Sequence, residues 1–280
     1  MIKIENLTKR FGERIAVAGI DLEIKRGEIF GLLGPNGAGK TNTVRILTLL
    51  SKKKSGSVKI CGYDIEKDSE RIKELIGVVP QHMSLDQDLT GRENLVLQAR
   101  LHHLKNKAAM EQRINEILEF VELTDRADDK SRRYSGGMKR RLMIGMALLH
   151  KPKMLFLDEP TVGLDPQVRR KMWDLIRKMN EAGMTVLLTT HYIEEADQLC
   201  RRVAIMNRGR IIAVDTPQKL KEKVGRVVVE HMEADGMINN FFDNREQAAS
   251  YVAGLNSNAT VREANLEDVF IELTGRRVND

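Results

Sequence analysis

The sequence feature that most limits the possible folds of this chain is a glycine-rich segment between an apolar run and a helical pattern. It has the form G-x-x-x-x-G-K-T and consists of Gly34, Pro35, Asn36, Gly37, Ala38, Gly39, Lys40 and Thr41. The apolar run Glu28–Leu33 precedes it and a helical pattern over Lys40–Leu50 follows it, which is the context of a phosphate-binding loop. Its glycines let main-chain amides point inward, and the helix N-terminus adds partial positive charge. We therefore predict a nucleotide-binding loop, with Lys40 reaching the β- and γ-phosphates and Thr41 binding Mg²⁺.

A second candidate site lies at the end of another apolar run. Met154–Leu157 leads directly into Asp158, Glu159 and Pro160. A buried strand here would deliver two carboxylates to the carboxyl edge of a sheet, where α/β proteins bind ligands. Asp158 is suited to hold Mg²⁺, directly or through water, and Glu159 is suited to orient and polarise an attacking water. For this segment alone, a surface turn before proline is the alternative.

A third motif precedes a helical pattern that runs to His150. It consists of Tyr134, Ser135, Gly136, Gly137 and Met138. The Ser135 side chain is suited to cap the helix, and the same segment is suited to bind an anion through its exposed amides. Taken alone, the motif is more typical of a helix cap than of an anion-binding site.

Short apolar runs alternate with longer helical patterns, which indicates an α/β sheet covered on both faces. The candidate strands are Ile2–Leu7, Ile20–Ile24, Glu28–Leu33, Leu75–Val79, Met154–Asp158, Thr185–Thr189, Val203–Met206 and Arg210–Val214. The candidate helices are Lys40–Leu50, Lys107–Val121, Met138–His150, Gln167–Asn180 and Tyr192–Cys200.

Two further regions have an organisation of their own. At about residues 84–150 the pattern is almost wholly helical, so we expect an inserted helical subdomain, which begins with a capping box of Thr90 and Glu93. Thr216–Pro217 marks a break, after which we expect a small α+β appendage. Its candidate strands are Arg226–Glu230 and Ala259–Glu263, and its candidate helices are Arg245–Leu255 and Leu266–Leu273.

The composition excludes several classes of protein. With 280 residues, 41% of them apolar, the chain can form a sizeable core and is not a disordered protein. No apolar run of about 18 residues occurs, which excludes a membrane-spanning helix, and we expect no secretory signal. Cys61 and Cys200 are the only cysteines, so we expect a reducing compartment. The net charge of +6 suits an anionic ligand or membrane face, but without interleaved basic and aromatic residues we expect no nucleic acid.

The three motifs, in this order and spacing, resemble those of the ATP-binding-cassette (ABC) ATPases. The resemblance implies a P-loop NTPase fold of the α/β class, with a mixed-sheet core, an antiparallel β subdomain, the helical subdomain and the C-terminal appendage. It also implies an ATP-binding domain at residues 1–215 and an accessory domain at residues 216–280.

The resemblance assigns nucleotide and metal roles to further residues. Phe11 stands where the family stacks an aromatic ring on adenine, and Asn42 stands where the family usually has a Ser or Thr that binds the α-phosphate. The Asn42 amide can still donate a hydrogen bond. Gln81 matches the glutamine that senses Mg²⁺ and water and touches the membrane partner, so it joins Thr41 and Asp158 as an expected Mg²⁺ residue.

The same resemblance assigns residues that act between two subunits. The signature loop, which caps the γ-phosphate of ATP on the opposite subunit, corresponds to Ser135, Gly136, Gly137 and Met138. Asp165 matches the D-loop, and His191 matches the switch histidine, which we expect to be catalytic together with Lys40 and Glu159. Taken singly, Phe11, Gln81, Asp165 and His191 also have ordinary explanations as core, loop, helix-cap and strand-end residues.

Some residues point to a subfamily. Tyr134 stands where leucine is common and Met138 where glutamine is common, and both variants are similar to those of daunorubicin-type drug-resistance ATPases. Further segments with this similarity are Gly91–Leu95, Glu194–Asp197 and Leu266–Phe270.

The resemblance therefore implies an exporter subunit that binds and hydrolyses ATP with Mg²⁺. Two copies would dimerise around ATP and drive a separate integral-membrane permease, and the chain would be cytoplasmic and peripheral on the inner face of the cell membrane. One alternative is a soluble ABC ATPase acting on nucleic acid or the ribosome, but only one cassette is present and no long coiled coil separates Gln81 from Ser135. The other alternative is a regulatory cassette that does not hydrolyse ATP. The presence of all catalytic-type residues argues against it, but the unusual Asn42 leaves this alternative open.

Overall fold

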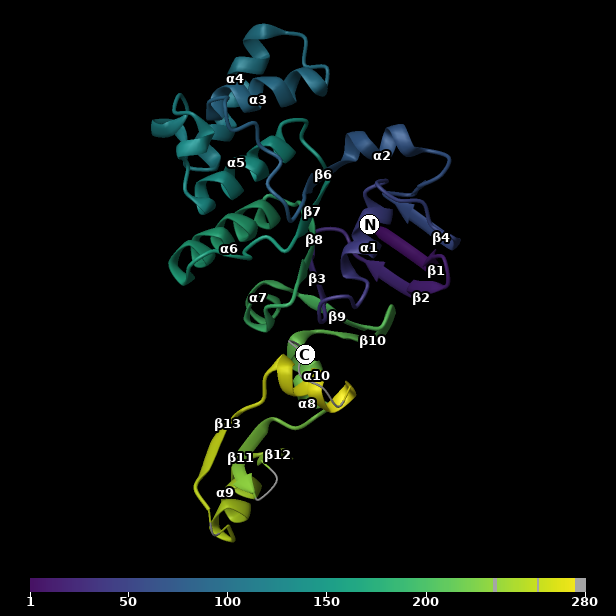
Figure 1. The fold of residues 1–280 in the computed structure, drawn as a ribbon, viewed down its shortest axis with the longest axis vertical. Coiled ribbons are helices and arrows are strands. Elements are labelled where there is room, and N and C mark those ends of the chain that lie inside the picture. The colour runs from purple at the N-terminus through teal and green to yellow at the C-terminus, as the bar shows by residue number, and fades with distance from the viewer. Residues whose placement is uncertain (234–235, 256, 275–280) are drawn as a thin grey trace.

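The computed structural model describes residues 1–233, 236–255 and 257–274, and its central layer is a six-stranded sheet (Figure 1). In spatial order the strands are β10 (Arg210–Asp215), β9 (Arg202–Asn207), β3 (Ile29–Leu33), β8 (Thr185–Thr190), β7 (Met154–Asp158) and β6 (Ile76–Val79). Neighbouring strands are parallel except for β10, which pairs antiparallel with β9 at the edge. The predicted α/β sheet is confirmed.

The two faces of this sheet are buried in different cores. Because successive side chains of a strand point to opposite faces, Phe30 and Leu32 of β3 enter one core, while Ile29 and Leu33 enter the other. The first core lies under α1 (Lys40–Leu47) and an antiparallel sheet. In spatial order that sheet is β2 (Arg14–Ile24), β1 (Ile2–Phe11), β4 (Ser55–Ile60) and β5 (Tyr63–Asp64). The second core lies under α5 (Gly136–Leu148), α6 (Pro166–Glu181) and α7 (Ile193–Leu199).

The region expected to be helical contains α3 (Gly91–Leu101), α4 (Lys107–Phe120) and α5. The short 3₁₀ helices Thr124–Arg126 and Ser131–Arg133 lie between α4 and α5. The capping box is confirmed: the Glu93 amide donates to Thr90 Oγ1 (3.0 Å) and the Thr90 amide donates to Glu93 Oε2 (2.7 Å). These bonds satisfy two amides that the first turn of α3 would leave without partners.

The C-terminal part combines a small sheet with helices that return to the main core (Figure 1). Its elements are α8 (Pro217–Glu222), β11 (Val227–Glu233), β12 (Gly236–Phe242), α9 (Arg245–Ala253), β13 (Ala259–Glu263) and α10 (Leu266–Thr274). The strands form an antiparallel sheet in the order β12–β11–β13, and α9 contacts β11 and β12. In contrast, α10 contacts α7 and α8, and its Val269 and Phe270 are buried in the core that α5–α7 share.

Thr216–Pro217, where we expect a break, lies between the end of β10 and the start of α8. Thr216 Oγ1 accepts a bond from the Lys219 amide (3.2 Å), and Pro217 occupies the first helical turn, where its missing amide costs nothing. One strand bound was wrong. Leu75 ends α2 (Ser69–Leu75) and is not part of β6. The elements α2, β4, β5, α8 and β12 were not predicted.

Two histidines stack within the helical region, and one of them, His150, bonds the Ile76 carbonyl of β6 (2.9 Å). The rings of His102, after α3, and His150, after α5, lie with centroids 4.0 Å apart and planes 8° apart. Burial and the nearby His150 and His103 lower the pKa of His102. Burial, opposed by a bond to the Ile76 carbonyl, lowers the pKa of His150, and Arg113 lowers it further.

We expect acid to destabilise this stack. Both histidines have pKa values lowered from 6.5 in the folded chain, so the unfolded chain binds more protons below about pH 6.5, and the free energy of unfolding falls as the pH drops through that range. Urea unfolding at about pH 7.5 and 5.5 measures the effect. His102→Phe should flatten part of this dependence, and the exposed His82→Gln should not. An identical pH slope in wild type and His102→Phe would contradict the prediction.

Candidate functional site

The phosphate-binding loop connects β3 to α1 and is built on glycines that no other residue can replace. A Cβ atom on Gly34 would lie 2.2 Å from the Met206 carbonyl oxygen, and one on Gly39 would lie 2.6 Å from the Ala16 carbonyl oxygen. Gly39 also has φ +108°, in the left-handed region that glycine favours. A bond from the Gly209 amide to the Ala38 carbonyl (2.8 Å) ties the loop to the β9–β10 turn. The loop conformation is therefore fixed by its surroundings.

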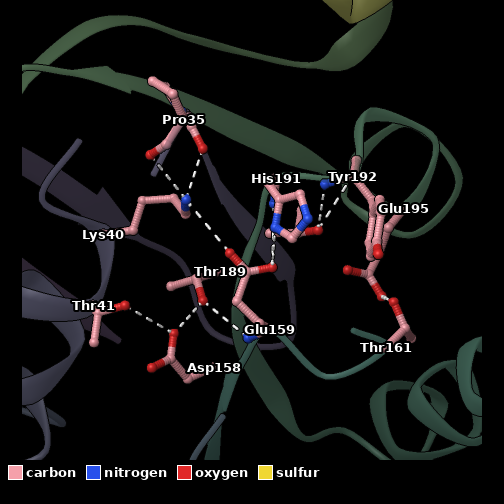
Figure 2. Close-up of polar contacts among 12 residues, drawn as sticks. Pro35, Lys40, Thr41, Asp158, Glu159, Thr161, Thr189, His191, Tyr192 and Glu195 are labelled. Atoms are coloured by element: carbon pink, nitrogen blue, oxygen red, sulfur yellow. Dashed lines mark hydrogen bonds and ion pairs between the residues drawn. The ribbon is translucent and has the colours of Figure 1, made fainter. Parts of the chain in front are cut away.

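Lys40 lies at the base of this loop and is only 5% exposed. Its Nζ donates to the carbonyls of Gly34 (2.6 Å) and Pro35 (3.3 Å) and forms an ion pair with Glu159 Oε1 at 3.4 Å (Figure 2). Burial lowers the pKa of Lys40, and the charges of Glu159 and Asp158 oppose that shift. An ammonium held by carbonyl oxygens at this place is suited to bind phosphate oxygens instead.

Asp158 ends β7 beside the first residues of α1. Its Oδ1 accepts from Thr189 Oγ1 (2.5 Å) and from Thr41 Oγ1 (3.4 Å). Thr189 Oγ1 in turn accepts from the Glu159 amide (3.1 Å), so one hydroxyl positions both acidic residues. The Thr41 hydroxyl and the Asp158 carboxylate are hard oxygen donors, which Mg²⁺ prefers.

Glu159 is 4% exposed and lies between a cation and an imidazole. On one side is Lys40, and on the other His191 Nδ1 lies 2.9 Å from Glu159 Oε2 (Figure 2). The His191 amide also donates to Oε2 (3.3 Å). Glu159 has φ +50°, a left-handed conformation that is unusual for a residue other than glycine and is a mark of functional sites.

In the part of the chain that it describes, the structure shows no direct polar contact between this cluster and four of the other predicted site residues. Within the described ranges, no hydrogen bond or ion pair joins the side chains of Phe11, Gln81, Ser135 or Asp165 to Lys40, Asp158, Glu159 or His191. Phe11 ends β1 with 53% exposure and has Lys9 Nζ 4.8 Å from its ring centroid. Gln81 follows β6 and is exposed, and Asn42 is half-buried in the first turn of α1.

The signature-loop segment at the start of α5 and the Asp165 segment at the start of α6 contact each other within the chain. Ser135 caps α5 by accepting from the Met138 amide (3.3 Å), and Asp165 caps α6 by accepting from the Gln167 (3.1 Å) and Val168 (3.0 Å) amides. A Cβ atom on Gly137 would lie 2.3 Å from Val168 Cγ1. Glycine is therefore required where the starts of α5 and α6 meet.

Sequence reasoning missed several residues of this site. Thr189 was placed in a strand but given no role, although a threonine at the end of a buried apolar strand is a usable signal. Glu195 is fully buried, and its Oε1 accepts from Thr161 Oγ1 (2.8 Å) and Trp173 Nε1 (3.2 Å). Burial raises the pKa of Glu195, and the hydrogen bonds from Thr161 and Trp173 oppose that shift. Glu195 thus connects the helix after His191 to the segment after Glu159 (Figure 2).

The family profile and the individual relatives that match this chain agree with each other. The sequence profile of the ABC transporter family matches residues 17–162. Over its full length the chain is 38% identical to the linearmycin resistance ATP-binding protein LnrL of Bacillus subtilis strain 168, all of which it covers. It is 39% identical to the daunorubicin resistance ATP-binding protein DrrA3 of Streptomyces coeruleorubidus, with 100% of this chain and 98% of that protein covered.

A solved structure extends the match to the fold. It is a dimeric post-hydrolysis state of the ATP-binding cassette MJ0796 bound to ADP and Pi, which superimposes with a TM-score of 0.69 at 30% identity. The superposition covers 77% of this chain and 98% of that one. In the described parts of the present chain, no helix is both long and apolar enough to cross a membrane.

Proposed function

The chain belongs to the ABC transporter family of ATP-binding proteins, and we propose that it is the ATP-hydrolysing subunit of an exporter whose membrane-spanning part is a separate polypeptide. The family match supports ATP as the nucleotide, and the cassette with bound ADP and Pi supports hydrolysis. The names of the two resistance proteins support export of a drug-like compound, and their similarity extends over the C-terminal part.

The position of Glu159 carries the proposal for the chemistry. Its carboxylate lies at the carboxyl end of β7, between Lys40 (3.4 Å) and His191 (2.9 Å). The loop amides and Lys40 would bind the phosphates and offset the charge of the transferring phosphoryl group. As water attacks the γ-phosphorus, Glu159 would accept its proton while the bond to the ADP oxygen breaks. His191 would hold the carboxylate in place and contact the γ-phosphate.

We extend the proposal to Mg²⁺ and the rest of the nucleotide. Thr41 and Asp158 would hold the ion, which when bound neutralises phosphate charge, and Thr189 keeps Asp158 oriented toward Thr41. Gln81 is assigned to the same ion only by resemblance. Phe11 is exposed enough to stack on adenine.

The placement of the signature loop supports a dimer of identical chains. Gly136 lies next to Leu164, whose Cδ2 would be 3.7 Å from a Cβ on Gly136, and the Ser135 side chain bonds the Met138 amide and not Lys40 or Glu159. A second copy, turned to face the first, would bring its Ser135 loop to the phosphates on this chain. Each ATP would then lie between the Lys40 loop of one copy and the Ser135 loop of the other.

A complementation experiment tests hydrolysis and this dimer together. Lys40→Ala and Ser135→Arg are each expected to abolish steady-state ATPase activity when purified alone. In a mixture, one site of the heterodimer would combine the intact Lys40 loop with the intact Ser135 loop, so activity should return in part. A mixture that stays as inactive as its components, although subunit exchange is demonstrated, would exclude the shared site.

We place the membrane partner at the surface near Gln81. A cavity of about 420 Å³ opens there and is lined by Pro80, Ser84, Gln98 and Met143, among others. Apolar side chains are exposed in the same segments: Met83 (44%), Leu97 (45%) and Leu101 (65%). Exposed apolar residues beside a cavity are typical of a protein–protein interface, and docking here would hold the chain at the inner face of the membrane.

A further inference from the structure

A buried arginine connects the segment around Gln81 to the acidic residue of the site. Arg140, in the second turn of α5, is 2% exposed. Its Nη1 donates to the Pro80 carbonyl (2.8 Å), and its Nη2 donates to the carbonyls of Gln81 (3.1 Å) and Glu159 (3.4 Å). One guanidinium therefore binds main-chain oxygens that follow two different strands, β6 and β7.

This arrangement is costly for the fold. Among the described residues, no carboxylate lies within ion-pair distance of Arg140, and its Nε is buried without a hydrogen-bond partner. Burial lowers the pKa of Arg140, and the more distant charges of Asp158 and Glu195 oppose the shift. Because a buried cation without a paired anion is unfavourable, a long apolar residue would suit this part of the core better. The cost of burying the Arg140 charge indicates that its contacts to the main-chain carbonyls have a functional role.

The contact with Glu159 fixes an unusual backbone conformation. Glu159 has φ +50°, and side chains from two other elements contact its main chain. Its amide donates to Thr189 Oγ1 (3.1 Å) and to the Thr189 carbonyl (3.2 Å), and its carbonyl accepts from Arg140 Nη2 and from the Val162 amide, both at 3.4 Å. The direction of the carboxylate toward Lys40 and His191 depends on this backbone. Without the guanidinium, the carbonyl would keep its turn contact to Val162 but lose its link to the Pro80–Gln81 segment, and the carboxylate could shift.

We propose that Arg140 is a positioning residue for hydrolysis: it holds the Glu159 backbone in its reactive orientation and links that orientation to the Pro80–Gln81 segment. The inference rests on the proposed function, because it concerns the water-activating role of Glu159. A displacement of Pro80–Gln81 by a docked partner would move the guanidinium and with it the Glu159 carbonyl. Partner engagement would thereby change the rate of hydrolysis without a contact to the nucleotide.

Arg140→Lys and its neighbour Arg141→Lys form the matched pair that tests this role. Lysine keeps the charge but presents its donors at a single nitrogen, without the planar fork by which Arg140 spans carbonyls after two strands. Arg141 lies on the same helix and also binds main-chain oxygens, those of Val121 (3.1 Å) and Glu122 (3.3 Å), away from the site. For Arg140→Lys we expect kcat to fall by about 10- to 100-fold, as small misplacements of reacting groups do, with KM for MgATP and Kd for a non-hydrolysable analogue unchanged. Arg141→Lys should keep wild-type kcat.

The readouts separate this inference from its premises. Turnover is expressed per subunit that binds nucleotide, so unfolded protein does not lower the measured kcat. If Arg140→Lys does not fold, Arg140→Gln is the second variant, because it carries no buried charge. Wild-type kcat in the folded Arg140 variant would overturn the inference, as would equal losses of kcat and affinity or an equal loss in Arg141→Lys. Absence of ATPase activity in the wild type, or full activity of Glu159→Gln, would instead contradict the proposed function.

Discussion

Glu159→Gln is expected to bind MgATP with nearly wild-type affinity while its steady-state hydrolysis falls by about 10²- to 10⁴-fold, the range that general bases contribute. The amide has the size of the carboxylate but cannot accept the proton of the attacking water. It also cannot serve as the anion between Lys40 (3.4 Å) and His191 (2.9 Å). Phosphate release measures turnover and calorimetry measures binding.

A matched variant separates this effect from a general change of charge. Glu194→Gln lies on α7 next to the buried Glu195, but the Glu194 side chain is 63% exposed and its ion-pair partner is Arg169 at 3.9 Å. It should hydrolyse ATP at the wild-type rate. We also expect ATP-dependent dimers to accumulate in Glu159→Gln alone, because its bound ATP is not consumed. Wild-type turnover in Glu159→Gln would remove this residue from the role of general base.

The parts of the site that sequence reasoning found are those that contiguous residues specify. The loop around Lys40 needs glycines at fixed positions between a strand and a helix, and the acid pair needs an apolar strand that ends in two carboxylates. Both requirements are local, so they can be recognised in a single sequence. The Asp165 and Ser135 caps are local in the same way, because each side chain accepts from amides two or three residues away.

What the sequence did not reveal depends on contacts between distant segments. The strand β4 begins with Ser-Gly-Ser, a turn-like pattern, and becomes a strand by pairing with β1. Arg140 looks like one of several exposed cations in a basic run, and only the fold turns it toward Pro80 and Glu159. Likewise, α10 has an amphipathic pattern that predicts a helix but not its return to α7 and α8. Such outcomes follow from tertiary packing, which overrides local propensity.

Lys40→Ala is expected to weaken MgATP binding by about 10²- to 10⁴-fold, because it removes two or more charge-assisted hydrogen bonds to phosphate oxygens at about 1.5–3 kcal/mol each. Calorimetry at millimolar nucleotide measures the loss, and Lys59→Ala, an exposed lysine on β4, should bind as wild type. The comparison with Glu159→Gln is decisive: Lys40→Ala should lose occupancy, whereas Glu159→Gln should lose turnover at full occupancy. If both variants lost affinity equally, Glu159 would act only as the counter-ion of Lys40, and the water would need another base.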